Sequence, residues 1–102
     1  MLGKKRIKED TPRTAVYELS VEYLCGSDRA EYLSAYFDRK MIAVLRKQNR
    51  IDGMREKCVY TIVLPDTVTS VGLVCDLSET HGILAVRIRE NMEIMMRRVF
   101  EI

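Results

Sequence analysis

The chain has 102 residues, of which 47% are hydrophobic and 31% are charged, and its formal net charge is +2. This length allows one domain with a modest core, and so small a net charge does not by itself indicate any partner. No apolar run approaches the ~18 residues that a membrane-spanning helix needs, so we expect no contact with a membrane. The three cysteines, Cys25, Cys58 and Cys75, are odd in number and scattered along the chain. They favour a reducing, cytoplasmic setting over a disulfide framework.

The N-terminal part of the chain divides into a tail and a first strand. Residues 1–12 are polar and basic, which predicts a disordered basic tail ahead of a single α+β domain over residues 13–102. From 13 to 24, apolar and polar residues alternate with a period of two. This alternation indicates a half-buried strand, which Cys25 and Gly26 end.

A helix is predicted next, over residues 28–50. Ser27 and Asp28 have the side chains of an N-cap, and Asp52 and Gly53 supply a stop signal. The apolar residues between them recur within an arc of about 120° at helical spacing. That arc is the expected core face of the helix.

Two apolar runs rich in β-branched residues follow, Cys58–Leu64 and Val68–Leu77, joined across Pro65, Asp66 and Thr67. Both runs are short and have no internal proline, which predicts an antiparallel hairpin with a tight turn. In the expected register Cys58 lies opposite Cys75. We expect this hairpin to be the nucleus of the fold.

Two interpretations compete beyond Gly82. Residues 83–88 alternate as a strand would, through Leu84, Val86 and Ile88, but the same positions also begin a stripe at helical spacing that continues to Ile102. We favour a C-terminal helix over residues 89–100. Strand and helix both stay open for 83–88.

The predicted order of strand, helix, strand, strand, helix indicates the α+β class. A right-handed crossover makes the first two strands parallel, and the third strand fits between them. The expected architecture is a small mixed three-stranded sheet with two helices packed on one face. This is a ferredoxin-like arrangement without its last strand.

No motif for chemistry is present. The sequence has no metal-ligand spacing, no glycine-rich phosphate loop and no nucleophile motif. His81 is the only histidine, and the nearby Cys75 belongs to an apolar run where a thiol is usually inert. We therefore expect a non-enzymatic module with no catalytic residue, metal, cofactor or small-molecule substrate.

The far side of the predicted helix 28–50 carries a segregated set of cations and two rings. These residues are Arg39, Lys40, Arg46, Lys47, Arg50, Tyr32 and Tyr36. Cations with stacking rings are typical of single-stranded nucleic-acid binders, and they also suit an acidic protein surface. The alternative is a solvated face whose cations are favoured near a helix C-terminus by the helix dipole.

The second face of the predicted sheet carries valines that neither helix would cover. They are Val16, Val59, Val63 and Val74. An exposed apolar patch usually marks a partner, and self-association is the simplest case. We therefore predict a binding module, a homodimer that acts through a protein partner. The alternative is a nucleic-acid-binding protein that uses the basic helix face and the basic tail.

Overall fold

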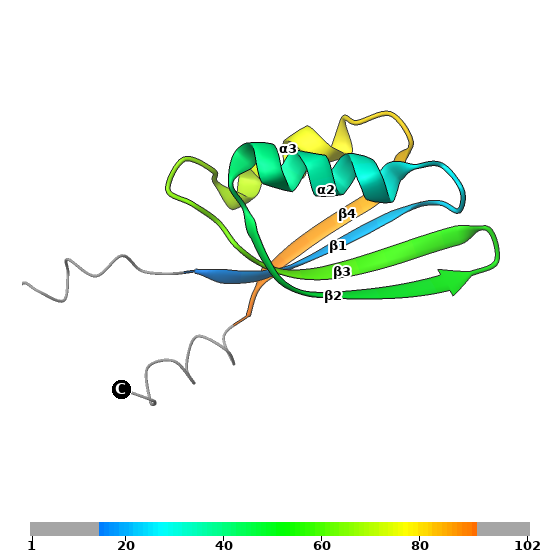
Figure 1. Ribbon diagram of the computed structural model, residues 1–102, viewed down its shortest axis with the longest axis horizontal. Coiled ribbons are helices and arrows are strands. Elements are labelled where there is room, and N and C mark those ends of the chain that lie inside the picture. The colour runs from blue at the N-terminus through cyan, green and yellow to red at the C-terminus, as the bar shows by residue number, and fades with distance from the viewer. Residues whose placement is uncertain (1–14, 92–102) are drawn as a thin grey trace, which may run out of the picture.

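The computed structural model of this protein describes residues 15–91. These residues form an antiparallel sheet of four strands and two helices (Figure 1). The elements in chain order are β1 (Val16–Leu24), α2 (Arg29–Lys40), β2 (Ala43–Asp52), β3 (Arg55–Val63), α3 (Ser70–Ser78) and β4 (Ile83–Glu90). The predicted tail over residues 1–12 lies outside the described residues, as does the predicted C-terminal helix beyond residue 91.

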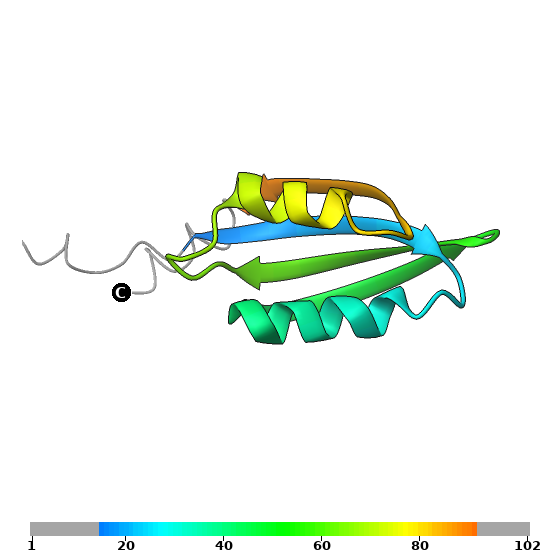
Figure 2. The ribbon, with the colours of Figure 1, turned by 90° about the horizontal axis from the view of Figure 1, so that it is seen from above.

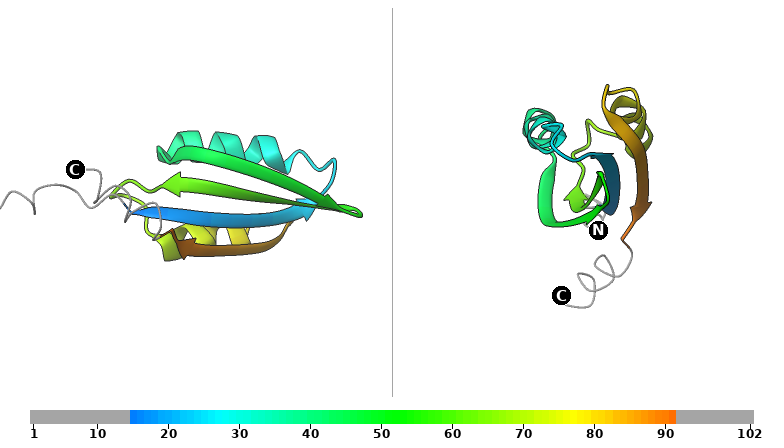
Figure 3. Two further views of the ribbon diagram at one scale, coloured as in Figure 1. Left: turned by 90° about the horizontal axis from the view of Figure 1, so that it is seen from below. Right: turned by 90° about the vertical axis from the view of Figure 1, so that its right-hand side faces the viewer.

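The strands lie in the order β2-β3-β1-β4, and each neighbouring pair is antiparallel. Both helices cover the same face of this sheet (Figures 2 and 3). The α+β class and the ferredoxin-like arrangement are confirmed. The predicted strand placement is wrong, because residues 58–63 belong to β3, which lies between β1 and β2 and is antiparallel to both, while the predicted central strand 68–77 contains helix α3. The prediction of a three-stranded sheet is wrong, because β4 adds a fourth strand beside β1.

The predicted helix over residues 28–50 is wrong in its second half. Helix α2 ends at Lys40, where Met41 adopts a left-handed backbone conformation with φ of 61° and donates its N–H to the carbonyls of Asp38 and Phe37. Residues 43–52 are instead strand β2, paired with β3. Arginine, lysine and glutamine are good helix formers, but pairing with β3 overrides this weak local preference.

The predicted hairpin is wrong in its second strand. The hairpin of the structure joins β2 to β3 through Gly53, which has φ of 66°. Residues 70–78 form helix α3, whose N-cap Thr69 accepts a hydrogen bond from the backbone N–H of Gly72 at 3.0 Å. Helical spacing places Leu73 and Leu77 on one buried side of α3, and burying both leucines favours the helix over a strand.

Because the predicted hairpin is wrong, the prediction that Cys58 lies opposite Cys75 is wrong as well. Cys58 is buried in β3, whereas Cys75 is exposed on α3, so the two thiols do not lie opposite each other on neighbouring strands. Of the two alternatives left open for residues 83–88, the structure has the strand, and β4 also includes Arg89 and Glu90, where the predicted C-terminal helix was to begin. Pairing with β1 gives the backbone of β4 hydrogen-bond partners.

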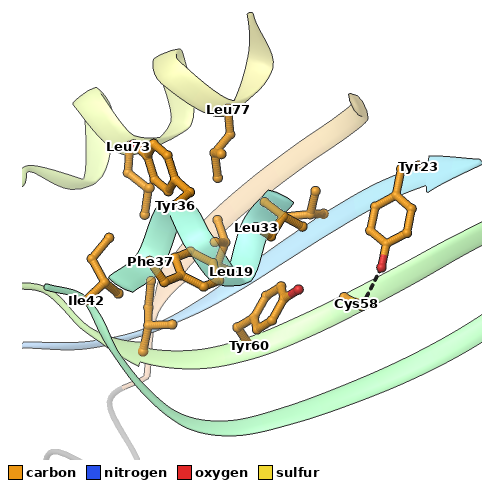
Figure 4. Close-up of a cluster of buried hydrophobic side chains, with 12 residues drawn as sticks. Leu19, Tyr23, Leu33, Tyr36, Phe37, Ile42, Cys58, Tyr60, Leu73 and Leu77 are labelled. Atoms are coloured by element: carbon orange, nitrogen blue, oxygen red, sulfur yellow. Dashed lines mark hydrogen bonds between the residues drawn. The ribbon is translucent and has the colours of Figure 1, made fainter. Parts of the chain in front are cut away.

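The hydrophobic core lies between the sheet and the two helices (Figure 4). Alternate residues of β1 and β3 point into it, among them Leu19 and Tyr60, and α2 contributes Leu33 and Phe37. The ring of Phe37 meets that of Tyr60 edge-on, with centroids 4.9 Å apart. None of the described helices is both long and apolar enough to cross a membrane.

Candidate binding surface on the open face of the sheet

The face of the sheet that neither helix covers, here called the open face, is seen from below in Figure 3. Successive side chains of a strand point to opposite faces. In β3, Cys58, Tyr60 and Ile62 enter the core, so the alternate residues Lys57 and Val59 belong to the open face. Strand register then decides which side chains of the neighbouring strands join them.

Register brings cations from three strands onto this face. Arg50 of β2 lies directly opposite Lys57 of β3, and Arg46 lies opposite Thr61. On the other side of β1, Arg87 of β4 lies opposite Ser20, which in turn is the partner of Val59. We call Arg46, Arg50, Lys57 and Arg87 the basic sheet patch.

Within residues 15–91, no salt bridge joins the basic sheet patch to an acidic residue, although Glu22 of β1 lies directly opposite Lys57. The two glutamates of β1 are each engaged elsewhere: Glu18 binds Arg89 at 2.8 Å and Glu22 binds Arg55 at 3.0 Å. None of the four patch cations makes an ion pair with a described residue. The patch is therefore a locally positive surface, although the whole chain carries a charge of only +2.

Two open hollows meet on this surface at Lys57 and Val59. The first, of about 570 Å³, is also lined by Gln48, Asn49 and Arg50. The second, of about 450 Å³, is also lined by Glu18, Ser20, Arg87, Ile88 and Arg89. The surface thus combines a central valine with hydrogen-bond donors and cations, which suits an anionic group better than an apolar ligand.

Residues from both predicted binding sets come together here. Arg46 and Arg50 were expected on a helix and Val59 and Val63 on a sheet face; strand pairing places all four on the open face. They form one surface because residues 43–52 are a strand. Their role in binding stays a prediction.

The other predicted cations lie on the helix side of the sheet. Arg39 and Lys40 end α2 and lie 5.6 Å and 5.9 Å from the ring centroid of Tyr36. Lys47 of β2 points to the same side and lies 6.0 Å from the ring centroid of Tyr60. The predicted basic face is therefore divided between two sides of the sheet.

The predicted stacking rings are part of the packing between the helices. Tyr36 is only 4% exposed, and its hydroxyl donates to Oδ2 of Asp76 at 3.0 Å. Burial, and then this hydrogen bond, raise the pKa of Tyr36 to about 12. Tyr32 is half-buried, and its ring stacks near that of Tyr36 with centroids 6.4 Å apart.

The remaining two predicted valines do not share the open surface. Val74 lies on helix α3 and is half-buried, because the segment that holds it is not a strand. Val16 lies opposite Val63 at the start of β1 and so belongs by register to the open face, but its side chain is fully buried. Of the four valines, only Val59 and Val63 are partly exposed residues of the sheet.

Among the groups with potential catalytic chemistry, Asp76 and Cys58 form hydrogen bonds with tyrosines of the fold. Cys75 is exposed on α3, while Asp76 accepts the Tyr36 hydrogen bond. In the core, Tyr23 and Cys58 form a hydrogen bond of 3.0 Å, and burial with this contact raises the pKa of Tyr23 above its usual range. Residues 15–91 contain no group of three or more histidine, cysteine or acidic side chains that could hold a metal ion.

Sequence reasoning missed Lys57 and Arg87. For Arg87, the signal was the alternation of charged and apolar residues, because Arg87 and Arg89 alternate with Val86 and Ile88. Lys57 stood just before an apolar run whose next residue, Cys58, is buried. Reading both segments as half-buried strands would have placed these cations on a solvent-facing side.

No family model and no curated protein sequence matches this chain. Among solved structures, the chain is similar to the ACT domain from GTP pyrophosphokinase of Chlorobium tepidum, with a TM-score of 0.62 and 9% sequence identity over 74% of this chain and 99% of that one. The fold is ferredoxin-like. The C-terminal domain of the MgtC protein from Mycobacterium tuberculosis is also similar, with a TM-score of 0.58 and 13% identity over 88% and 94% of the two chains.

One similar structure is a larger enzyme, a formyltetrahydrofolate deformylase from Pseudomonas putida KT2440. It aligns with a TM-score of 0.61 and 16% identity over 72% of this chain but only 28% of the enzyme chain. At these identities the likeness concerns the fold alone. The same arrangement of strands and helices occurs in domains of proteins with different names, so function has to be argued from the open face itself.

Proposed function

We propose that this chain is a non-enzymatic binding module of the reducing cytosol, and that its basic sheet patch binds an acidic surface of a protein partner. The observation that carries the proposal is the pair Arg50 and Lys57, which are direct cross-strand partners. Glu22, which lies opposite Lys57 on β1, forms its salt bridge with Arg55 instead. Like charges directly opposite each other destabilise a sheet. A cost without a folding benefit is explained if an anionic partner neutralises both charges.

The similar structures are consistent with a module of this kind. Two of them are named as domains, the ACT domain from GTP pyrophosphokinase and the C-terminal domain of the MgtC protein. The free thiols of Cys25, Cys58 and Cys75 support a reducing compartment.

Nucleic acid is the second candidate partner, and the open face supports it less well. Sequence-tolerant binding of single strands uses aromatic rings on which bases stack. Within the described strands, the open face carries no aromatic side chain, since Tyr17, Tyr23 and Tyr60 belong to or pack against the core on the helix side. Only phosphate contacts would remain, and these weaken steeply with salt.

Self-association is the third candidate. Two copies meeting through Val59 would bring two basic sheet patches against each other, which like-charge repulsion opposes. An acidic partner satisfies both the valine and the cations, so we favour it over a homodimer formed through this face.

Binding of a labelled peptide of ten glutamates at about 0.15 M salt tests the proposal. The double variant Arg50→Gln/Lys57→Gln should weaken binding roughly tenfold, because two exposed ion pairs of ~0.2–1 kcal/mol each are lost. The matched control is Arg39→Gln/Lys40→Gln, which removes the same charge from the helix side and should bind almost as tightly as the parent. Equal losses in both variants would mean that only overall charge matters and would overturn the proposal.

Two further measurements decide between the candidates. A mixed-sequence oligonucleotide that binds more tightly than the peptide, and more tightly than an abasic strand of equal length, would establish the nucleic-acid alternative. Sedimentation that shows a dimer dissociated by Val59→Glu would establish self-association through the open face.

A further inference from the structure

Strand β2 forms one edge of the sheet, since β3 is its only neighbour. All ten of its residues are exposed, and Figure 1 shows the strand running along the margin of the sheet, past the end of α2. We propose that this edge binds an extended, acidic segment of a protein partner as a fifth strand. The inference rests on the proposed function for the charge of the partner and adds how that partner is held.

The backbone of β2 provides the first argument. In an edge strand, alternate residues direct their N–H and C=O groups away from the sheet, where they form a template for another strand. No backbone hydrogen bond joins Ala43–Asp52 to any described residue outside β3. The pairing is continuous from Arg46 to Asp52, because the single register shift lies between Val44 and Arg46.

The side chains of β2 provide the second argument, because its two faces differ. Arg46 and Arg50 belong to the open face, four residues apart and so about 13 Å along the strand. On the helix side, Val44 and Ile51 remain 42% and 65% exposed, with Lys47 and Asn49 between them. An added strand that alternates acidic with apolar residues would place carboxylates beside the arginines and cover the apolar side chains.

The charge of β2 also indicates which strands it excludes. It carries Arg46, Lys47 and Arg50 against the single acid Asp52, a net charge of +2. Charges on an edge protect it against pairing with neutral or like-charged strands, and two copies of β2 would bring two such strands together. An acidic strand is instead attracted by the same cations. The cations of β2 therefore both disfavour pairing with neutral or basic strands and favour pairing with an acidic one.

The probe for a binding test is a peptide of ten residues, the length of β2, in which glutamate and valine alternate. Two derivatives carry backbone N-methyl groups, one on every glutamate and one on every valine. In an extended strand these two sets of N–H groups point to opposite edges, so one derivative should lose binding at least tenfold and the other should bind as the parent peptide does. Amide hydrogen exchange should slow at alternate residues between Arg46 and Asp52.

Composition and charge are controlled separately. A peptide with the glutamates grouped before the valines has the same charge and should bind more weakly, because it cannot present alternate faces. Arg46→Gln/Arg50→Gln should weaken binding of the alternating peptide, while Arg39→Gln/Lys40→Gln should not.

The inference is overturned if both N-methylated peptides bind as tightly as the parent peptide, or if exchange slows at Lys57 and Arg87 but not in β2. In that case the ten-glutamate peptide can still bind the basic sheet patch, and the proposed function stands without strand addition. If no acidic peptide binds at all, the proposed function itself fails.

Discussion

Replacing Arg50 by glutamate should stabilise the fold and weaken partner binding at the same time. Arg50 lies opposite Lys57, and because β2 is an edge strand it has no second cross-strand neighbour. The substitution turns a repulsive pair into an attractive one. A residue retained for folding would not behave in this way.

The size of the effect follows from the position of the pair. Charged cross-strand pairs contribute roughly 0.2–1 kcal/mol in either direction, and exposure of Arg50 favours the lower part of that range. Reversing the sign counts twice, so Arg50→Glu should raise the unfolding free energy by about 0.4–1 kcal/mol. That corresponds to a rise in Tm of roughly 2–6 °C.

Arg46→Glu is the matched control. It makes the same charge change on the same strand and face, but Arg46 lies opposite the neutral Thr61, so stability should change little. Thermal and urea unfolding of both variants measure the difference. At about 1 M salt the Debye length falls to ~3 Å, and the two variants should become equally stable.

The reasoning is refuted if Arg50→Glu is no more stable than Arg46→Glu at low salt, or if its advantage persists unchanged at high salt. For binding, both variants should bind a ten-glutamate peptide more weakly than the parent. If Arg50→Glu is stabilised but still binds the peptide as the parent does, the repulsion between Arg50 and Lys57 has no role in binding.

Three other predictions concern buried and exposed groups. Tyr23→Phe removes the hydroxyl that lies 3.0 Å from Sγ of Cys58 and should lower the unfolding free energy by about 1 kcal/mol; urea denaturation with no loss would contradict a stabilising bond. Tyr36 has its folded pKa raised from 10.0 to about 12, so the stability contributed by its neutral form is complete below pH 10 and is lost as pH rises through 12. Tyr36→Phe should therefore flatten the fall of stability in that range, and an unchanged slope in denaturation at successive pH values would disprove it. A thiol reagent should label the exposed Cys25 and Cys75 in the folded protein and the buried Cys58 only after unfolding; fast labelling of all three would show that the core is open.

The sequence determined those elements whose signal is local and consistent. The period-two alternation of residues 13–24 predicted β1, and the apolar run from Cys58 predicted most of β3. Element order also led to the α+β class and a ferredoxin-like arrangement, although the strand predicted between the first two, Val68–Leu77, contains helix α3 instead. These features follow because burial of one strand face and the hand of a crossover hardly depend on details elsewhere.

Tertiary structure decided the segments whose local signals conflict. Residues 43–52 contain good helix formers in a helical arc, yet they form β2 because β3 offers its backbone a complete partner. Val68–Leu77 has strand composition, but Thr69 caps a helix that buries Leu73 and Leu77. Local preferences of a few tenths of a kcal/mol per residue are smaller than the gain from pairing a strand or burying two leucines.

The candidate site shows the same division. The sequence indicated Arg46 and Arg50 as segregated cations and Val59 as an exposed residue of a sheet. Only strand register assembled them with Lys57 and Arg87, which come from segments up to 41 positions apart in the chain (46 to 87). A shift of one residue in any of these pairings would send those side chains to the opposite face, so the surface exists only once the whole sheet has formed.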